Sequence, residues 1–211
     1  SIRVGENLDK CDVLLLVTKP QDIETVLNQI NGKVKPGSLV VSFAAGKKIS
    51  TISNGLSGLN PVVRVMPNTP TLVGKGAAGF SLGSGVTDHQ KKFVIDFLTA
   101  AGVAVEVDEK LQDAVTATSG SGPAYFFAFV ESMVKGAVDL GLSEEVATQL
   151  TVQTIIGAAE LLATSGKNAT TLRENVTSPN GTTYAALQSF AASDLDKIVA
   201  NAMKAARDRP I

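Results

Sequence analysis

The chain has 211 residues, enough for one large domain or two small ones, and its composition is that of a globular protein. Hydrophobic residues make up 44% and aromatic residues only 5%, which favours a core of small and branched aliphatic side chains. The 19 basic and 20 acidic residues leave a net charge of -1, so the chain lacks the positive surface that a nucleic acid partner requires.

Cys11 is the single cysteine, which excludes an internal disulfide and favours a reduced protein of the cytoplasm. No apolar run reaches the roughly 18–20 residues needed to span a bilayer. The most apolar run, AYFFAFV, stops at Glu131. We therefore expect neither a membrane nor a nucleic acid among the partners of this chain.

Short apolar runs alternate with amphipathic stretches in the first half of the chain. DVLLLV, SLVVSF and VVRVM have the length and character of buried strands, and GAAGFSL and VAVEV are typical of two more. Amphipathic stretches predict helices over residues 20–30, 48–56 and 88–101. This β-α-β rhythm predicts an α/β domain over residues 1–108.

Strand patterns disappear after residue 108, and long helical stretches take their place. A helix predicted over 123–140 ends before Gly141, a residue type common at helix C-termini, and Ser143 is expected to cap the next helix. Further helices are expected over residues 143–165, 170–176, 182–190 and 194–208. Residues 109–211 are therefore predicted to form an all-α domain.

Three loops follow predicted strands, where open α/β sheets bind their ligands. They are VTKPQ at residues 17–21, AAG at 44–46 and MPNTP at 66–70. Small residues let a flat ligand approach the backbone, Lys19 could meet a phosphate or a ribose, and Asn68 offers both a donor and an acceptor. Each loop alone could be an ordinary turn, since Pro, Gly and Asn are common in turns, but three in succession favour a ligand site.

The pattern at Gly74–Gly79 matches the G-x-G-x-x-G of dinucleotide-binding loops, but it leads into a strand-like run and opens no helix. We do not expect it to bind a cofactor. The β-α-β rhythm also begins in mid-pattern at SIRVGENLDK. Either an N-terminal β-α-β segment is missing, or no dinucleotide binds.

The stretch TSGSGPAYFF places two Ser-Gly pairs directly before an apolar helical run. Pro123 suits the first position of a helix, and Gly120 and Gly122 leave the neighbouring backbone amides unshielded. The pattern predicts a helix entrance that binds a small carboxylate or phosphate. A serine N-cap with flexible glycines is the simpler alternative, but it explains only one of the two pairs.

A second stretch of this kind is VTSPNGTTYAAL. It predicts a tight turn at Asn180–Gly181 and a cap at Thr182 or Thr183, with a helix that begins near Tyr184. A plain turn and cap is the stronger alternative here.

Side chains suited to acid-base or metal chemistry are scarce. The single histidine, His89, falls on the polar face of a predicted helix, so neither a Ser-His-Asp triad nor a metal site is expected. Glu131 is an isolated carboxylate. The chemistry should therefore need little from side-chain acids.

Five motifs occur in the order and approximate spacing seen in pyrroline-5-carboxylate reductases, which complete proline synthesis: VTKPQ, SFAAG, RVMPNTP, DAVTATSGSGPAY and VTSPNGTT. The chain resembles this family over essentially all of its length, and SGSGPAY together with SP-x-GTT is highly specific. The resemblance implies a Rossmann-type NAD(P)-binding domain, here without its N-terminal part, followed by an all-α dimerisation domain. It also implies NADPH or NADH as the cofactor and homodimers that assemble into larger rings, up to a decamer.

The resemblance implies functions for individual residues. Those implied to bind the cofactor are Val17, Thr18, Lys19, Pro20, Ala44, Ala45, Gly46 and Asn68. Those implied to bind the substrate are Ser119, Gly120, Ser121, Gly122, Gly181, Thr182 and Thr183. Thr183 is the implied catalytic residue, facing the substrate nitrogen. Two features depart from the family pattern: Val17-Thr18 replaces the usual Ala-Val, and Asn180 replaces the commoner Gly.

The expected reaction is the reduction of 1-pyrroline-5-carboxylate to L-proline by NAD(P)H. A cyclic imine accepts hydride at carbon and can take its proton from water, so placement and a hydrogen bond from Thr183 could suffice. One alternative is a hydroxyacid dehydrogenase, which would want a lysine close behind the glycine-rich helix entrance, whereas the first one here is Lys135. The other is a non-catalytic NAD(P)-binding or scaffolding protein.

Overall fold

The computed structural model of the chain describes residues 7–209. These residues form two compact units. The first runs to Pro123 and includes the end of the chain from Met203, and the second contains Ala124–Ala202. The strands lie in the first unit and the second is helical, while the division into domains at residues 108 and 109 stays a prediction.

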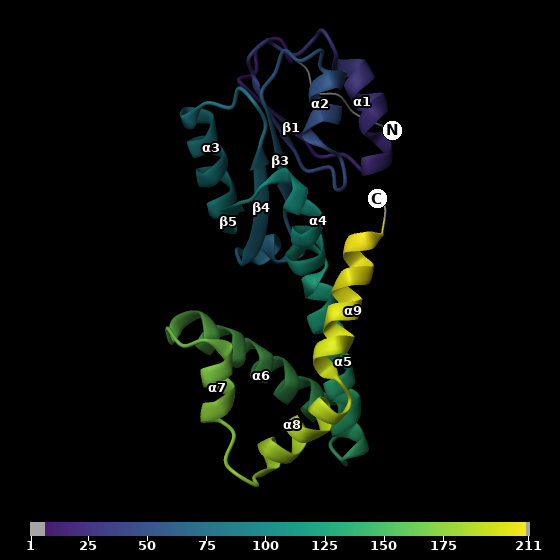
Figure 1. Ribbon diagram of the computed structural model, residues 1–211, viewed down its shortest axis with the longest axis vertical. Helices are drawn as coiled ribbons and strands as arrows, with labels where there is room; N and C mark the ends of the chain where they lie inside the picture. The colour runs from purple at the N-terminus through teal and green to yellow at the C-terminus, as the bar shows by residue number, and fades with distance from the viewer. Residues whose placement is uncertain (1–6, 210–211) are drawn as a thin grey trace. The chain divides into compact units, whose positions relative to one another are not determined.

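The first unit is built around a five-stranded sheet (Figure 1). Its strands, in sequence order and in spatial order, are β1 (Val13–Leu16), β2 (Leu39–Ser42), β3 (Val62–Met66), β4 (Gly76–Leu82) and β5 (Gly102–Glu106). Strands β1, β2 and β3 are parallel, and so are β4 and β5. Strand β4 is antiparallel to β3 because no crossover helix separates them. The predicted α/β class and its strands are confirmed.

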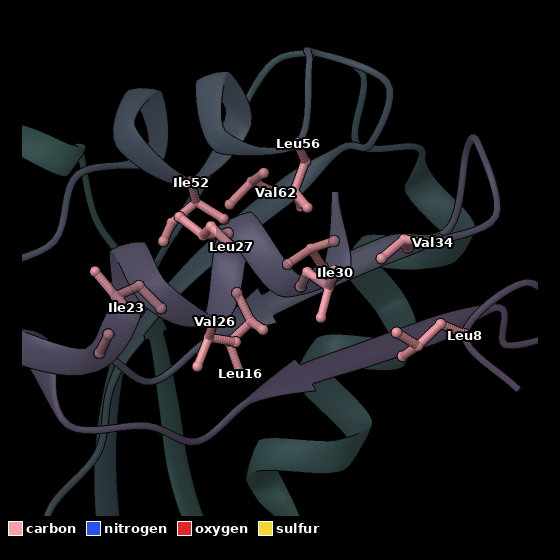
Figure 2. Close-up of a cluster of buried hydrophobic side chains, with 12 residues drawn as sticks. Leu8, Leu16, Ile23, Val26, Leu27, Ile30, Val34, Ile52, Leu56 and Val62 are labelled. Carbon is pink, nitrogen blue, oxygen red and sulfur yellow. The ribbon is translucent and has the colours of Figure 1, made fainter. Parts of the chain in front are cut away.

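Helices α1 (Ile23–Ile30) and α2 (Ile49–Gly55) cover one face of the sheet (Figure 1). The α1 sequence places apolar side chains at i, i+3, i+4 and i+7, so that one stripe of the helix faces the sheet. The side chains of this stripe are those of Ile23, Val26, Leu27 and Ile30. Figure 2 shows them meeting Ile52 of α2 and Val62 of β3 in one buried cluster.

Helix α3 (Asp88–Thr99) packs on the opposite face. Thr87 and Gln90 begin it with reciprocal hydrogen bonds between side chain and backbone, which satisfy two amides of the first turn. Val94 and Leu98 are buried against the sheet, as the predicted apolar face requires. Phe93 and Phe97, on the same face, remain 38% and 44% exposed and stack on one another.

The G-x-G-x-x-G pattern lies where the sequence context predicted. Gly74 ends a 3-10 helix (Thr69–Val73) in the left-handed conformation, with φ 69°, and Gly76 begins β4. A dinucleotide loop would have to open a helix after a strand. The pattern therefore does not form a phosphate-binding loop.

The chain after β5 is helical, as predicted. The helices are α4 (Gln112–Val115), α5 (Gly122–Asp139), α6 (Glu144–Thr164), α7 (Ala169–Asn175), α8 (Thr182–Ala192) and α9 (Leu195–Asp208). The chain turns after α5 at Gly141, which adopts φ 103°, and the Ser143 hydroxyl accepts a hydrogen bond from Val146 N at 3.3 Å to cap α6. Both signals were predicted from the sequence.

Helix α6 is apolar but scarcely buried, with only Ala147 and Thr151 buried among its residues. By length and composition it is the one helix within residues 7–209 that could cross a membrane. The same composition also suits a helix that packs against another protein surface. Large side chains on α5, such as Phe126 and Phe127, are more than 60% exposed, so the apolar surface extends beyond α6.

Arg64 is a charged residue in a buried strand and is only 5% exposed. Its guanidinium lies 3.6 Å from Glu109 Oε1 and 3.4 Å from Asp113 Oδ1. Glu109 Oε1 also accepts a hydrogen bond from the backbone N of Ile49 at 2.6 Å. One buried cation therefore connects β3, the start of α2 and the segment that leads into and forms α4.

We expect the double variant Glu109→Gln/Asp113→Asn to lower the free energy of unfolding by about 1–3 kcal/mol, because the buried guanidinium loses both counter-charges, although both carboxylates are partly exposed. Urea unfolding at fixed protein concentration measures this change. As a control, Asp96→Asn removes the exposed pair with Lys92 and should cost less than about 0.5 kcal/mol. A double variant as stable as the unchanged protein would contradict a structural role for these ion pairs.

Candidate functional site

The three loops predicted to bind a ligand leave parallel strands at the same edge of the sheet. Leu16 and Ser42, the last residues of β1 and β2, are paired in the parallel ladder. Met66 ends β3 two residues beyond the partner of Ser42. The carboxyl ends of these strands therefore lie side by side, which is where open α/β sheets bind ligands.

A hollow of about 930 Å³ begins at this edge and extends over the sheet toward α3. Its lining is mostly apolar and comes from the ends of β1 and β3, from β4, β5 and α3, and from the loops next to them. The lining residues are Leu15, Val17, Phe43, Met66, Pro67, Asn68, Thr69, Thr71, Leu72, Gly76, Ala78, Phe97, Leu98, Ala100, Ala101, Val103 and Gly120. Such a surface suits a flat, weakly polar ring better than a highly charged group.

The predicted cofactor residues are distributed around this edge. Val17 and Asn68 line the hollow. Lys19 is exposed and comes directly before the short 3-10 helix Pro20–Asp22. Gly46 adopts φ 72° and lines a smaller hollow of about 410 Å³, so the structure does not gather all these residues around one cavity.

Thr18 carries a buried hydroxyl oxygen that has no hydrogen-bond partner within the described residues. An unpaired buried hydroxyl costs about 1–3 kcal/mol. This group lies in the loop where the family pattern has Val. The hydroxyl is therefore either a cost of the local sequence or a donor for a ligand.

Helix α5 begins at Gly122, close to the predicted start at Pro123, but the prediction that the SGSGP stretch forms a free helix entrance is wrong. A π-helical turn, Thr116–Gly120 (the π-turn), follows α4, and only Ser121 separates it from α5. The N–H of Ser121 donates to the carbonyl of Thr116 at 2.8 Å. The Ser119 hydroxyl donates to the carbonyl of Val115 at 3.1 Å. The segment is therefore the interior of a helical run and no free helix terminus.

Pro123 gives the physical reason for the π-turn. In a regular α-helix the carbonyl of Ser119 would accept from the N–H of residue 123, and proline has none. The hydrogen-bond ladder then shifts by one residue, as the bond between Ser121 and Thr116 shows. Turns of this kind within helices occur often at functional sites. The substrate-binding role of residues 119–122 stays a prediction, on a different backbone geometry.

Asn68 joins the MPNTP loop to the π-turn. Its Nδ2 donates to the carbonyl of Ser119 at 3.1 Å, and its Oδ1 accepts from the backbone N of Ala77 at 2.8 Å. Met66 packs against the same turn, since its terminal methyl fills the space that a Cβ at Gly120 would occupy. The structure thus brings together a predicted cofactor residue and two predicted substrate residues.

Two residues in this region were not found by sequence reasoning. Gln112 is completely buried, and its Nε2 donates to Ser81 Oγ at 2.9 Å, which fastens the start of α4 to β4. Nothing in the local sequence distinguishes this glutamine from an exposed one. Arg64 did leave a signal, because a charge within the apolar run VVRVM must find a counter-charge nearby.

The start of α8 differs from its prediction. Neither Thr182 nor Thr183 caps the helix: Gly181 is the N-cap, without a side-chain cap, and Thr182 is the first helical residue. Asn180 takes the left-handed conformation with φ 58°, which allows the helix to start earlier than expected. Both threonines lie in the first turn, where backbone amides lack helical partners. This stretch belongs to the second compact unit.

The shifted carboxyl pKa values belong to surface ion pairs and do not mark a catalytic acid. Hydrogen bonds from Arg207 and Lys204 lower the pKa of Asp208 to about 2. A hydrogen bond from Lys35 lowers the pKa of Asp12. Within residues 7–209 no three His, Cys, Asp or Glu side chains gather as metal ligands, and His89 is exposed.

The chain is similar to known proteins along nearly all of its length. Residues 109–210 match the family model for pyrroline-5-carboxylate reductase dimerisation. A Pyrroline-5-carboxylate reductase of Pseudomonas aeruginosa is 42% identical over 206 residues, 97% of this chain and 76% of that protein. The Arabidopsis thaliana reductase is 38% identical over 97% of this chain and 74% of its own length.

Solved structures agree with these relatives. A pyrroline-5-carboxylate reductase from Coxiella burnetii superimposes with a TM-score of 0.90 at 34% identity, covering 97% of this chain and 77% of that one. The Plasmodium falciparum reductase with NADP bound gives 0.87 at 35% identity, covering 96% and 77%. The Rossmann-type fold with a helical dimerisation segment is thereby confirmed. The chain belongs to the pyrroline-5-carboxylate reductase family, NAD(P)H-dependent oxidoreductases that reduce 1-pyrroline-5-carboxylate in proline biosynthesis.

Proposed function

We propose that this chain reduces 1-pyrroline-5-carboxylate to L-proline at the carboxyl edge of β1, β2 and β3. The observation that carries the proposal is the hydrogen bond from Asn68 to Ser119, which joins the predicted cofactor loops to the predicted substrate segment. A relative from Plasmodium falciparum was solved with NADP bound. The apolar hollow and the left-handed Gly46 fit a nicotinamide dinucleotide at this edge.

The residues proposed to hold the cofactor are Val17, Thr18, Lys19, Pro20, Ala44, Ala45 and Gly46, with Asn68 at the rim. Ala45 and Gly46 are partly exposed and small, so their backbone is accessible to a flat ring, whereas Ala44 is buried. The exposed Lys19 suits an anionic part of the cofactor. When bound, the reduced nicotinamide supplies the hydride. The apolar lining from Val17, Phe43 and Pro67 keeps water from the ring.

The proposed substrate residues act through hydrogen bonds. Residues 119–122 hold the carboxylate of the substrate and so fix its position. Gly181 leaves the first turn of α8 accessible, and the positive end of that helix favours an anionic ligand. Thr183 places its hydroxyl against the ring nitrogen. The imine carbon accepts hydride and the nitrogen accepts a proton, so the C=N double bond becomes a C–N single bond while one C–H and one N–H bond form, and water can supply the proton.

The assembly and location complete the proposal. The dimerisation model matched by residues 109–210 shows that the chain is an oligomer-forming protein. We extend this to a homodimer through the helical segment, built up into a decamer. The cytoplasm fits the single unpaired cysteine, Cys11.

The oxidation of NADPH, followed by absorbance, tests the reaction. Turnover with 1-pyrroline-5-carboxylate but not with 3-hydroxy acids supports the proposal, and the reverse pattern favours a hydroxyacid dehydrogenase. Saturable NADPH binding without turnover of either substrate favours a non-catalytic binding protein. A protein that shows no NADPH binding at all would contradict the proposed cofactor site.

We expect Thr183→Ala to lower kcat by about 10- to 100-fold, because an oriented hydrogen bond to the reacting nitrogen is lost. The Kd for NADPH should change far less. Thr183→Ser keeps the hydroxyl and should retain most activity, and Thr170→Ala, an exposed threonine of α7, is the control. Equal losses in kcat and in NADPH affinity would refute the assigned role.

We expect Thr18→Val to raise the free energy of unfolding by about 1 kcal/mol, because valine removes an unpaired buried hydroxyl and keeps the shape of the side chain. Thermal unfolding and NADPH titration of the same variant measure stability and affinity. An unchanged Kd for NADPH would show that Thr18 contacts the cofactor through its backbone only. Affinity weakened by about tenfold, a loss of about 1.4 kcal/mol, would show instead that the hydroxyl bonds the cofactor.

A further inference from the structure

Asn68 occupies the position before the 3-10 helix Thr69–Val73, where an asparagine side chain would ordinarily cap the first turn. It makes no such cap. Both ends of its amide are instead bonded to distant backbone groups, the carbonyl of Ser119 and the N–H of Ala77. The Asn68 side chain therefore makes two tertiary hydrogen bonds in place of a local helix cap.

The bond to Ser119 replaces a partner that the sequence removes. Pro123 has no N–H, so the Ser119 carbonyl lacks the donor that an α-helix would supply four residues later. Asn68 donates to this carbonyl from 51 residues away in the sequence. The asparagine and the proline therefore act together: Pro123 removes one helical hydrogen bond to the Ser119 carbonyl, and Asn68 supplies another donor to it.

The bond to Ala77 gives the asparagine a fixed position. Ala77 lies in β4, which is paired with β3 and with β5. Because Oδ1 is held by this strand, Nδ2 points in one direction only, and the π-turn is tied to the sheet. The methyl of Met66 packed against Gly120 adds an apolar contact beside the hydrogen bond.

We propose that Asn68 is a positioning residue, which sets the distance between the substrate carboxylate held by residues 119–122 and the nicotinamide at the sheet edge. This inference rests on the proposed function and changes one part of it, because Asn68 acts through Ser119 and not as a ligand of the cofactor. Hydride transfer needs its atoms about 3–3.5 Å apart, and a misplacement of about 1 Å can cost about 100-fold in rate. A misplaced π-turn therefore lowers kcat/KM without weakening the binding of the cofactor.

The variant Asn68→Asp tests this assignment. The aspartate has the same shape and still accepts from Ala77, but it turns an oxygen toward the Ser119 carbonyl in place of a donor. We expect kcat/KM for pyrroline-5-carboxylate to fall by about 100-fold and the Kd for NADPH to change by less than about threefold. Asn28→Asp, on the exposed face of α1, controls for the added charge.

A loss of NADPH affinity as large as the loss in kcat/KM would overturn the proposal in favour of a direct cofactor contact. An unchanged kcat/KM would overturn it as well. Circular dichroism checks that Asn68→Asp is folded. We expect the variant to keep its helices as well as its NADPH affinity, which excludes misfolding as the cause of lost activity.

Pro123→Ala supplies a second, independent test. Alanine restores an N–H that can donate to the Ser119 carbonyl, so the donor from Asn68 becomes less necessary. We expect Asn68→Ala to lower kcat/KM at least about threefold less in the Pro123→Ala background than in the unchanged protein, a coupling between contacting residues. Equal losses in the two backgrounds would contradict the shared role of these residues.

Failure of the proposed function can be separated from failure of this inference. If the unchanged protein turns over no pyrroline-5-carboxylate, the proposed function fails. Amide hydrogen exchange over residues 119–125 then still decides whether the hydrogen bond from Asn68 stabilises the π-turn. Faster exchange there in Asn68→Ala supports it, and unchanged exchange overturns it.

Discussion

The parallel pairing of β1, β2 and β3 is the constraint on which the rest of this structure depends. Both faces of the sheet carry apolar clusters, one under α1 and α2 and the other under α3, so the strands have no room for free polar side chains. Buried polar side chains such as Arg64 and Ser81 are taken up by bonds within the protein, so polar groups that can meet a ligand collect where the strands end. Because the three strands run in the same direction, their ends form one edge, and segments far apart in the sequence meet there.

Three side chains then fasten the first helical run after β5 to the sheet and to the loop after β3. Arg64 bonds to the acidic residues at its beginning, Gln112 bonds to β4, and Asn68 bonds to the π-turn. Each of these links is polar, and Gln112 and Arg64 are buried. Buried polar links act only at a defined geometry, since an unpaired group is costly, and so they fix orientation more strictly than apolar packing does. A reaction that depends on placement, and has few acids or bases available, is well served by such links.

Much of the fold could be predicted from the sequence, because it is encoded locally. The apolar runs predicted the strands to within a residue, the α1 stripe follows helical periodicity, and Ser143 and Gly141 mark the boundaries of helices.

The π-turn could not be predicted, since glycine and proline before an apolar run are also typical of a helix start. What decides between the two is the helical run that precedes Ser119 and a donor from Asn68, and neither is visible within the stretch itself. The cap of α8 was misplaced: with Asn180 left-handed, Gly181 is the N-cap and the helix begins at Thr182, two residues before Tyr184. The functions of the site residues rest on resemblance to the family, and the geometry adds which of them are in contact.

The thinly buried helices α5 to α9 have a consequence for how the protein behaves in dilute solution. Only Gly122, Ala147 and Thr151 are buried among the residues of these helices, and the match of residues 109–210 to the dimerisation family model indicates that an oligomer shields this apolar surface. By mass action, the melting temperature of such a protein rises with protomer concentration. Dilution then lowers the stability of the helical segment, so the catalytic lifetime of an enzyme sample depends on its protein concentration.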